Sequence, residues 1–139
     1  MTLDPFAGPG YQGLLALHQA VDADAEFPAG LLELLRLRCS RLNGCSYCTR
    51  LHSGQALAAG ESRERVDHVD DWRTHPAFTP AERTAFALVD AVTLIRDGVP
   101  EDVRTAAIGA FGEPGVQQLI WLAVVVNSFN RMAVGMGVR

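Results

Sequence analysis

Residues 43–52, NGCSYCTRLH, bring together two cysteines and a histidine, side chains that can act as nucleophile, second thiol and base. Cys45 and Cys48 are three positions apart, and His52 follows four positions later. On a helix, at about 100° per residue, all three side chains share one face. Thiols at positions i and i+3 are also close enough to form a disulfide. The spacing therefore predicts a dithiol with an imidazole beside it.

The first turn of a helix is a favourable place for such a pair. Unpaired backbone N–H groups and the helix dipole lower the pKa of a thiol there, and the thiolate is the nucleophile. His52, one turn further along, can take the thiol proton or give it to a leaving group. Attack on a peroxide would oxidise one sulfur to a sulfenic acid, and the other sulfur would condense with it to a disulfide. The motif favours peroxide chemistry without telling the two cysteines apart.

Other interpretations of the pair remain open at this stage. A zinc site would need a fourth ligand beside Cys45, Cys48 and His52, and Cys39 or His68 would have to supply it. Structural zinc sites usually have two cysteine knuckles, however, and this chain has one. Both cysteines could instead be small buried residues. A thioredoxin-type motif is disfavoured, because it requires a βαβ context that this chain lacks.

Glu33 is the carboxylate that stands out, because two leucines flank it on either side in GLLELLRL. A carboxylate buried in so apolar a helix would have a raised pKa, which suits proton transfer. The alternative is an exposed glutamate that pairs with Arg36 one turn further on. The remaining histidines are assigned to solvent or packing positions: His18, His68 and His75.

The elements that would position these residues are all helices. Boundary signals predict helices over 11–21, 28–42, 45–59, 63–72, 79–98, 100–112 and 114–135. Among these signals, Asn43–Gly44 ends the helix before the cysteines, and TPAE at 79–82 is a capping box with proline at the first helical position. No segment of the sequence has a convincing β-strand pattern as an alternative to these helices. The sequence therefore predicts a single all-α domain over 1–139, a compact bundle of about six to seven helices, with the motif on the hairpin 28–59.

Composition restricts the partners of the protein. Hydrophobic residues make up 48% of the 139 residues, which predicts a homo-oligomer that buries the surplus between copies. The net charge is −4 and all twelve cations are arginine, which disfavours nucleic acid as a partner. Asp4 and the broken apolar run after it argue against a signal peptide, and no segment is apolar enough to span a membrane. A cytoplasmic protein is expected, in which Cys39 is a small buried thiol and Trp121 belongs to the core or to a subunit interface.

Eleven residues separate Glu33 from Cys45, and the pattern E-x11-C-x-x-C-x-x-x-H resembles the core motif of the AhpD-like alkylhydroperoxidases, within the carboxymuconolactone decarboxylase superfamily. The resemblance covers the hairpin 28–59 and extends, with less similarity, to WLAVVVNSFNRMAVGMG at 121–137. It implies an all-α fold that assembles as a trimer or hexamer. The last helix carries an Asn-x-x-Asn-Arg pattern, expected to tie that helix to the hairpin: Asn127, Asn130 and Arg131.

The resemblance also implies roles for the motif residues. Cys48 would be the peroxidatic cysteine, Cys45 would resolve it into a disulfide, and His52 would activate Cys48. Glu33 would complete a proton relay through His52, directly or by way of water. A thiol reductant or electron-donor protein would recycle the disulfide, and no metal or other cofactor is implied. AhpD itself carries a second histidine where this chain has Tyr47, so the relay is either incomplete or relies on another proton donor.

The sequence therefore favours a thiol-dependent (alkyl)hydroperoxide reductase or disulfide oxidoreductase, with a peroxide or small organic molecule as substrate. Two other functions stay open. One is a decarboxylase- or isomerase-like enzyme that uses His52 and Glu33 as acid and base on a small organic acid. The decarboxylase branch generally lacks the CxxC, so the cysteines argue against lactone decarboxylation. The other is a redox-sensing or metal-binding oligomer without turnover.

Overall fold

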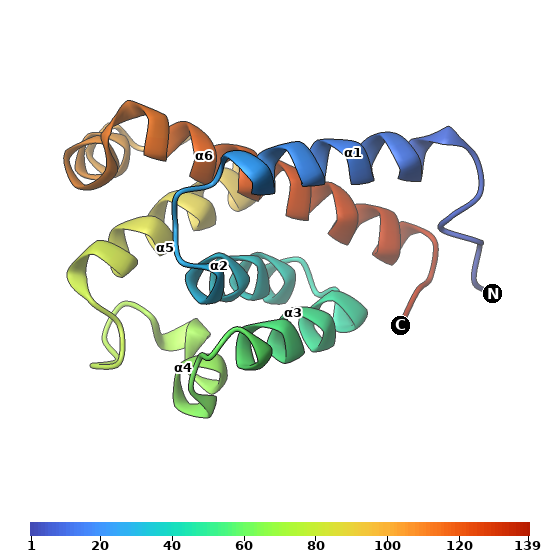
Figure 1. Cartoon of the computed structure of the whole chain (residues 1–139), viewed down its shortest axis with the longest axis horizontal. Coiled ribbons are helices and arrows are strands. Elements are labelled where there is room, and N and C mark those ends of the chain that lie inside the picture. The colour runs from blue at the N-terminus through green and yellow to red at the C-terminus, as the bar shows by residue number, and fades with distance from the viewer.

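The computed structural model describes residues 1–139 and contains only helices (Figure 1). The helices are, in chain order, α1 (Pro9–Asp24), α2 (Ala29–Leu42), α3 (Ser46–Ala58), α4 (Arg63–Asp67), the 3₁₀ helix η1 (Val69–Asp71), α5 (Pro80–Leu94) and α6 (Glu101–Gly135). The all-α fold class predicted from the sequence is confirmed.

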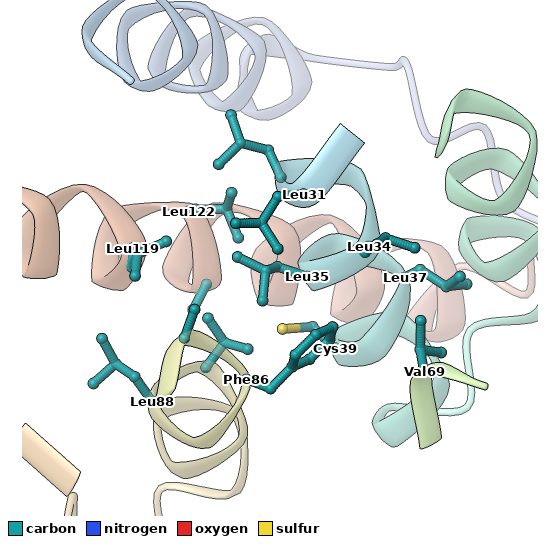
Figure 2. Packing of buried hydrophobic residues seen from close by; sticks show 14 of the residues in the cluster. Leu31, Leu34, Leu35, Leu37, Cys39, Val69, Phe86, Leu88, Leu119 and Leu122 are labelled. Atoms are coloured by element: carbon teal, nitrogen blue, oxygen red, sulfur yellow. The ribbon is translucent and has the colours of Figure 1, made fainter. Parts of the chain in front are cut away.

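Helix α2 lies at the centre of the bundle and contacts α3, α5 and α6. Nine of its fourteen residues are buried, so this helix is packed on several faces rather than along one stripe. Figure 2 shows its leucines between Leu119 and Leu122 of α6 on one side and Val69 on another. The candidate carboxylate and the hairpin that carries the cysteines are therefore built on the most buried element of the fold.

The segment 63–72 differs from its prediction. The sequence predicts one helix, whereas the structure has the short α4 followed by η1. Val66, Val69 and Trp72 recur at every third position, and each is at most 5% exposed. A spacing of three matches the 3₁₀ helix better than the α-helix, because a 3₁₀ turn contains three residues. Burial of these three side chains decides the local geometry.

Two other helix boundaries can be compared with their signals. The capping box at the start of α5 is present: the Thr79 side chain accepts the N–H of Glu82, and the Glu82 carboxylate accepts the N–H of Thr79. Helix α5 ends at Leu94, earlier than predicted. Gly112 interrupts α6 with φ 69° and ψ 168°, a conformation that glycine adopts readily, so the predicted break between two helices is confirmed there.

Asparagine side chains join the last helix to the motif hairpin, as expected from the sequence. The amide of Asn43, in the turn between α2 and α3, donates to Oδ1 of Asn127 at 2.8 Å and to Oδ1 of Asn130 at 2.9 Å. Asn130 in turn donates to the Ser40 hydroxyl at 3.0 Å. Arg131 donates to Asn127 Oδ1 at 3.0 Å. These buried and half-buried bonds fix α6 against the turn that holds the cysteines.

The two ends of the chain lie together at the end of the molecule nearest the α2–α3 turn (Figure 1). The N–H of Leu3 donates to the carbonyl of Met136 at 2.9 Å, and the Thr2 hydroxyl donates to the carbonyl of Gly137 at 3.2 Å. Val138 packs against a small cluster formed by the two motif cysteines and α6. The terminal segments therefore border the motif.

One face of α6 is apolar and uncovered. Trp121 is 50% exposed and Val124, three residues on and so on the same side of the helix, is 38% exposed. Trp121 is thus not a core residue, and its other predicted position, a subunit interface, stays a prediction. No helix of the structure has both the length and the hydropathy needed to cross a membrane.

Candidate active site

A tight turn between α2 and α3 places the first cysteine. Gly44, at φ 66°, donates its N–H to the carbonyl of Arg41 at 3.1 Å, and the Cys45 N–H donates to the carbonyl of Ser40 at 3.0 Å. This is the Schellman pattern of helix termination, which requires a residue in the left-handed region. Cys45 is also the N-cap of α3, and its sulfur accepts the N–H of Cys48 at 3.2 Å. Three residues therefore suffice to end one helix and to begin the next with a cysteine.

The two cysteines form a disulfide, with their Cα atoms 5.3 Å apart. Both side chains are buried, at 1% and 4% exposure for Cys45 and Cys48. They pack against Ala133 of α6. The structure thus describes the oxidised form of the dithiol that the sequence motif predicts.

Glu33 and His52 lie side by side although they come from different helices. His52 Nδ1 is 2.8 Å from Glu33 Oε2, and Arg36 Nη1 donates to the other carboxylate oxygen, Oε1, at 2.7 Å. Their side chains are largely buried, at 15% exposure for Glu33, 12% for His52 and 6% for Arg36. Arg36 also pairs with Asp22 of α1. Both sequence interpretations of Glu33 are therefore partly right, since it pairs with Arg36 and is also largely buried against His52.

The predicted direction of the Glu33 pKa is wrong. Burial alone would raise the pKa of this carboxyl group, but the hydrogen bond from His52 and the positive charge of Arg36 together outweigh it, so the pKa lies below its ordinary value. Glu33 is therefore an ionised carboxylate, which can only accept hydrogen bonds. His52 must then carry a proton on Nδ1, which leaves Nε2 of the neutral ring free to accept one.

A cavity of about 540 Å³ opens beside this pair. Cys48 and His52 both contribute to its wall, whereas Cys45 does not. The lining is mostly apolar and comes from both chain ends, α1, α3 and α6, with Arg36 from α2. The apolar residues include Phe6, Leu15, Leu51, Val126, Phe129 and Met132. Cys48 is consequently the sulfur that a molecule in the cavity would meet, a distinction that helix geometry alone did not provide.

Comparison with known proteins agrees with this architecture. Residues 9–91 match the model of the carboxymuconolactone decarboxylase family. The chain belongs to this family. The uncharacterized protein YdfG of Bacillus subtilis (strain 168) is 30% identical to this chain over 108 residues, which span 77% of this chain and 74% of YdfG.

A solved structure shows that the whole fold is AhpD-like. The protein ATU0492 of Agrobacterium tumefaciens, of unknown function but suggested to be the antioxidant defence protein AhpD, superposes with a TM-score of 0.90 at 28% identity. The match covers 96% of this chain and 92% of that protein. The resemblance inferred from the motif is therefore confirmed at the level of family and fold.

Cys39 and His68, the two residues named as possible fourth zinc ligands, make their contacts away from the cysteine pair. Cys39 is fully buried in the core (Figure 2). Its sulfur accepts a hydrogen bond from the Thr93 hydroxyl at 3.3 Å. Burial raises the pKa of this thiol to about 12. His68 stacks on His75 at 4.2 Å between ring centroids. No group of three or more histidine, cysteine or acidic side chains has an arrangement suited to a metal ion.

His18 is the site residue that the sequence analysis misses. It was assigned to solvent or packing, yet its ring lines the same cavity as Cys48 and His52. Helix α1 packs along α6, and the His18 ring meets the Phe129 ring edge-on at 5.9 Å. No local pattern in the sequence points to this position, because it depends on how α1 packs along α6.

Proposed function

We propose that the protein is a thiol-dependent hydroperoxide reductase in which Cys48 attacks the peroxide. One observation carries the proposal: Cys48, already paired with Cys45, lines an apolar cavity together with His52, whose Nδ1 is held by an ionised carboxylate. A base with a fixed tautomer, a thiol and a space for an organic molecule are the parts that such a reaction requires. Membership of the carboxymuconolactone decarboxylase family and the AhpD-like fold support the same assignment.

The reaction starts from the reduced dithiol. His52 takes the thiol proton of Cys48 through Nε2, and Glu33 stabilises the imidazolium that results. The Cys48 thiolate attacks the terminal oxygen of the hydroperoxide, the O–O bond breaks, and the departing alkoxide takes the proton from His52 to give an alcohol. Cys48 becomes a sulfenic acid, which condenses with the Cys45 thiol to form the disulfide and release water.

A dithiol reductant, or an electron-donor protein with a dithiol, closes the cycle by supplying two electrons and two protons. Its thiolate attacks one sulfur of the Cys45–Cys48 bond, and a thiolate leaves from the other. The Cys48 N–H, which already points at the Cys45 sulfur, would stabilise a leaving thiolate at Cys45. The cytoplasm is the compartment that we propose, since each turnover requires the disulfide to be reopened.

A homo-oligomer is the assembly that we propose, as a trimer or hexamer. The uncovered pair Trp121 and Val124 on α6 supports it, because exposed aromatic and aliphatic side chains on one helix face are typical of a contact between copies. The high share of hydrophobic residues, 48%, points in the same direction.

The experiment that tests the function counts thiols after one equivalent of cumene hydroperoxide. The wild-type protein has three thiols when reduced and should lose two of them, then regain both with dithiothreitol. Cys48→Ser should not react, whereas Cys45→Ser should stop at a sulfenic acid that a dimedone probe traps. Cys39→Ser is the matched control and should behave as wild type, because Cys39 lies in the core.

Two results would contradict the proposal. One is a Cys48→Ser variant that consumes peroxide at the wild-type rate, and the other is a wild-type protein that keeps all three thiols. The family model is named for a decarboxylase, so the second candidate is acid–base chemistry by His52 and Glu33 on a small organic acid. Turnover of such an acid by the Cys45→Ser/Cys48→Ser double variant would favour that candidate.

A further inference from the structure

The cavity contains a second imidazole, that of His18, which the mechanism above does not use. His52 has its Nδ1 bound to Glu33. His18 Nε2 lies 3.5 Å from Asp22 Oδ2, beyond the usual length of a hydrogen bond, and the side chain is 31% exposed. The edge contact with Phe129 restrains the ring. His18 thus presents an imidazole to the cavity with no strong partner among the protein groups.

Charged groups reach His18 from three helices. Asp22 lies on its own helix, Arg36 and Glu33 lie on α2, and His52 lies on α3. The part of α6 that lines the cavity contributes no charged side chain. The remaining titratable groups in the wall are two phenols, those of Tyr11 and Tyr47, and, in the reduced protein, the thiol of Cys48.

These surroundings favour the neutral ring. Burial is the largest influence and lowers the pKa of His18, while the nearby carboxylate of Asp22 opposes it in part. The imidazole is therefore mostly neutral at pH 7. In that form it offers one nitrogen that accepts a hydrogen bond.

We propose that His18 binds the substrate: its neutral imidazole accepts the hydrogen bond of the terminal O–H of a hydroperoxide in the cavity and holds that oxygen toward the Cys48 sulfur. The inference rests on the proposed peroxidase function and adds a substrate-contacting residue to it. The division of labour follows from the geometry, because His52, held by Glu33, receives the thiol proton and cannot at the same time accept the peroxide O–H.

The bond changes are consistent with this role. When the thiolate attacks, the terminal oxygen keeps its hydrogen and becomes the S–OH oxygen, while the other oxygen leaves as alkoxide. The group that accepts the O–H hydrogen bond therefore needs to take no proton during the step. A protonated His18 has no lone pair to offer, so this contact is lost when the ring is protonated.

The test compares His18→Gln and His18→Phe, with His68→Gln as control, in steady-state reduction of cumene hydroperoxide. Gln keeps an acceptor oxygen, whereas Phe keeps only the ring. We expect kcat/KM to fall about tenfold in His18→Phe, as for loss of one hydrogen bond of about 1.4 kcal/mol, and to stay within about threefold of wild type in His18→Gln. His68, on the surface beside Asp71, should have no effect.

The pH profile separates this role from mere packing. In wild type, part of the fall in kcat/KM on acidification should come from protonation of His18. The His18→Gln variant lacks this group, so its kcat/KM should fall less steeply on the acid side. Equal losses in both His18 variants with an unchanged pH profile would overturn the proposal, as would a His18→Phe enzyme equal to wild type.

A measurement on the oxidised protein distinguishes failure of this inference from failure of the proposed function. The disulfide form cannot reduce peroxide, so binding can be followed alone. The imidazole NMR signal of His18, identified by its absence in His18→Gln, should shift on titration with cumene hydroperoxide. If wild type turns over the peroxide while this signal stays unchanged, His18 does not bind the substrate and the peroxidase function stands. If wild type shows no turnover, the proposed function fails and this inference fails with it.

Discussion

Replacement of Glu33 by Gln tests how far the site depends on one carboxylate. Glu33 accepts a hydrogen bond from His52 at 2.8 Å and another from Arg36 at 2.7 Å, one on each oxygen. Gln has a single acceptor oxygen. Whichever partner keeps that oxygen, the amide NH₂ of the new side chain faces a group that also donates.

The expected magnitude follows from these two bonds. A hydrogen bond to a charged group contributes about 1.5–3 kcal/mol, so loss of one of them should lower the free energy of unfolding by about 2–3 kcal/mol at pH 7. A domain of this size has a free energy of unfolding of about 5–15 kcal/mol, so the Glu33→Gln protein should remain folded at 25 °C. The His52 tautomer is no longer fixed, and we expect kcat/KM for cumene hydroperoxide to fall about 10²-fold.

The stability difference should also depend on pH. The folded-state pKa of Glu33 lies below its ordinary value of 4.5, so the carboxylate stabilises the fold above pH 4.5. This stabilisation is lost as the pH falls below 4.5 through the folded-state pKa. Glu33→Gln has no such group. The difference in the free energy of unfolding between wild type and Glu33→Gln should be largest at pH 7 and should become smaller toward about pH 3.

Urea unfolding at both pH values and steady-state kinetics measure the two effects. Glu113→Gln is the control, because Glu113 is an exposed glutamate with no ion pair, and it should match wild type in both assays. Wild-type kcat/KM in Glu33→Gln would refute the relay. A difference in the free energy of unfolding between the two proteins that stays constant from pH 7 to pH 3 would show that Glu33 is not ionised in the folded protein.

Two further predictions concern the core thiol and the uncovered face of α6. Because burial raises the pKa of Cys39 to about 12, iodoacetamide at pH 8 should leave Cys39 unmodified in the reduced native protein and should modify it only after unfolding; modification of Cys39 in the native state would contradict its burial. Trp121→Glu places a charge on the proposed contact between copies and should lower the molar mass measured by light scattering, whereas an unchanged mass would exclude this face from the interface.

The sequence by itself determined the features that depend on interactions between residues close together in the chain. The helix boundaries at Asn43–Gly44 and at the Thr79 capping box follow from hydrogen bonds within a few residues, so the signals were sufficient. The motif hairpin is equally local, since one Schellman turn joins α2 to α3. The all-α class followed from such signals, and the family from the E-x11-CxxCxxxH spacing on the same hairpin.

Tertiary structure decided everything that depends on neighbours from other helices. The pKa of Glu33 is lowered rather than raised, because His52 of α3 donates to the carboxylate in addition to Arg36 of the same helix. The sequence suggests Arg36 and His52 as separate partners of Glu33, but only the packing of α3 against α2 brings both to one buried carboxylate. The segment 63–72, predicted as one helix, forms α4 and η1 because the side chains at every third position, Val66, Val69 and Trp72, are buried in the core. The cavity is lined by Cys48 and not by Cys45, and His18 of α1 also lines it, because α1 packs on α6 and α6 packs on the hairpin. Such contacts are fixed by the packing of whole helices, and no short stretch of the chain encodes them.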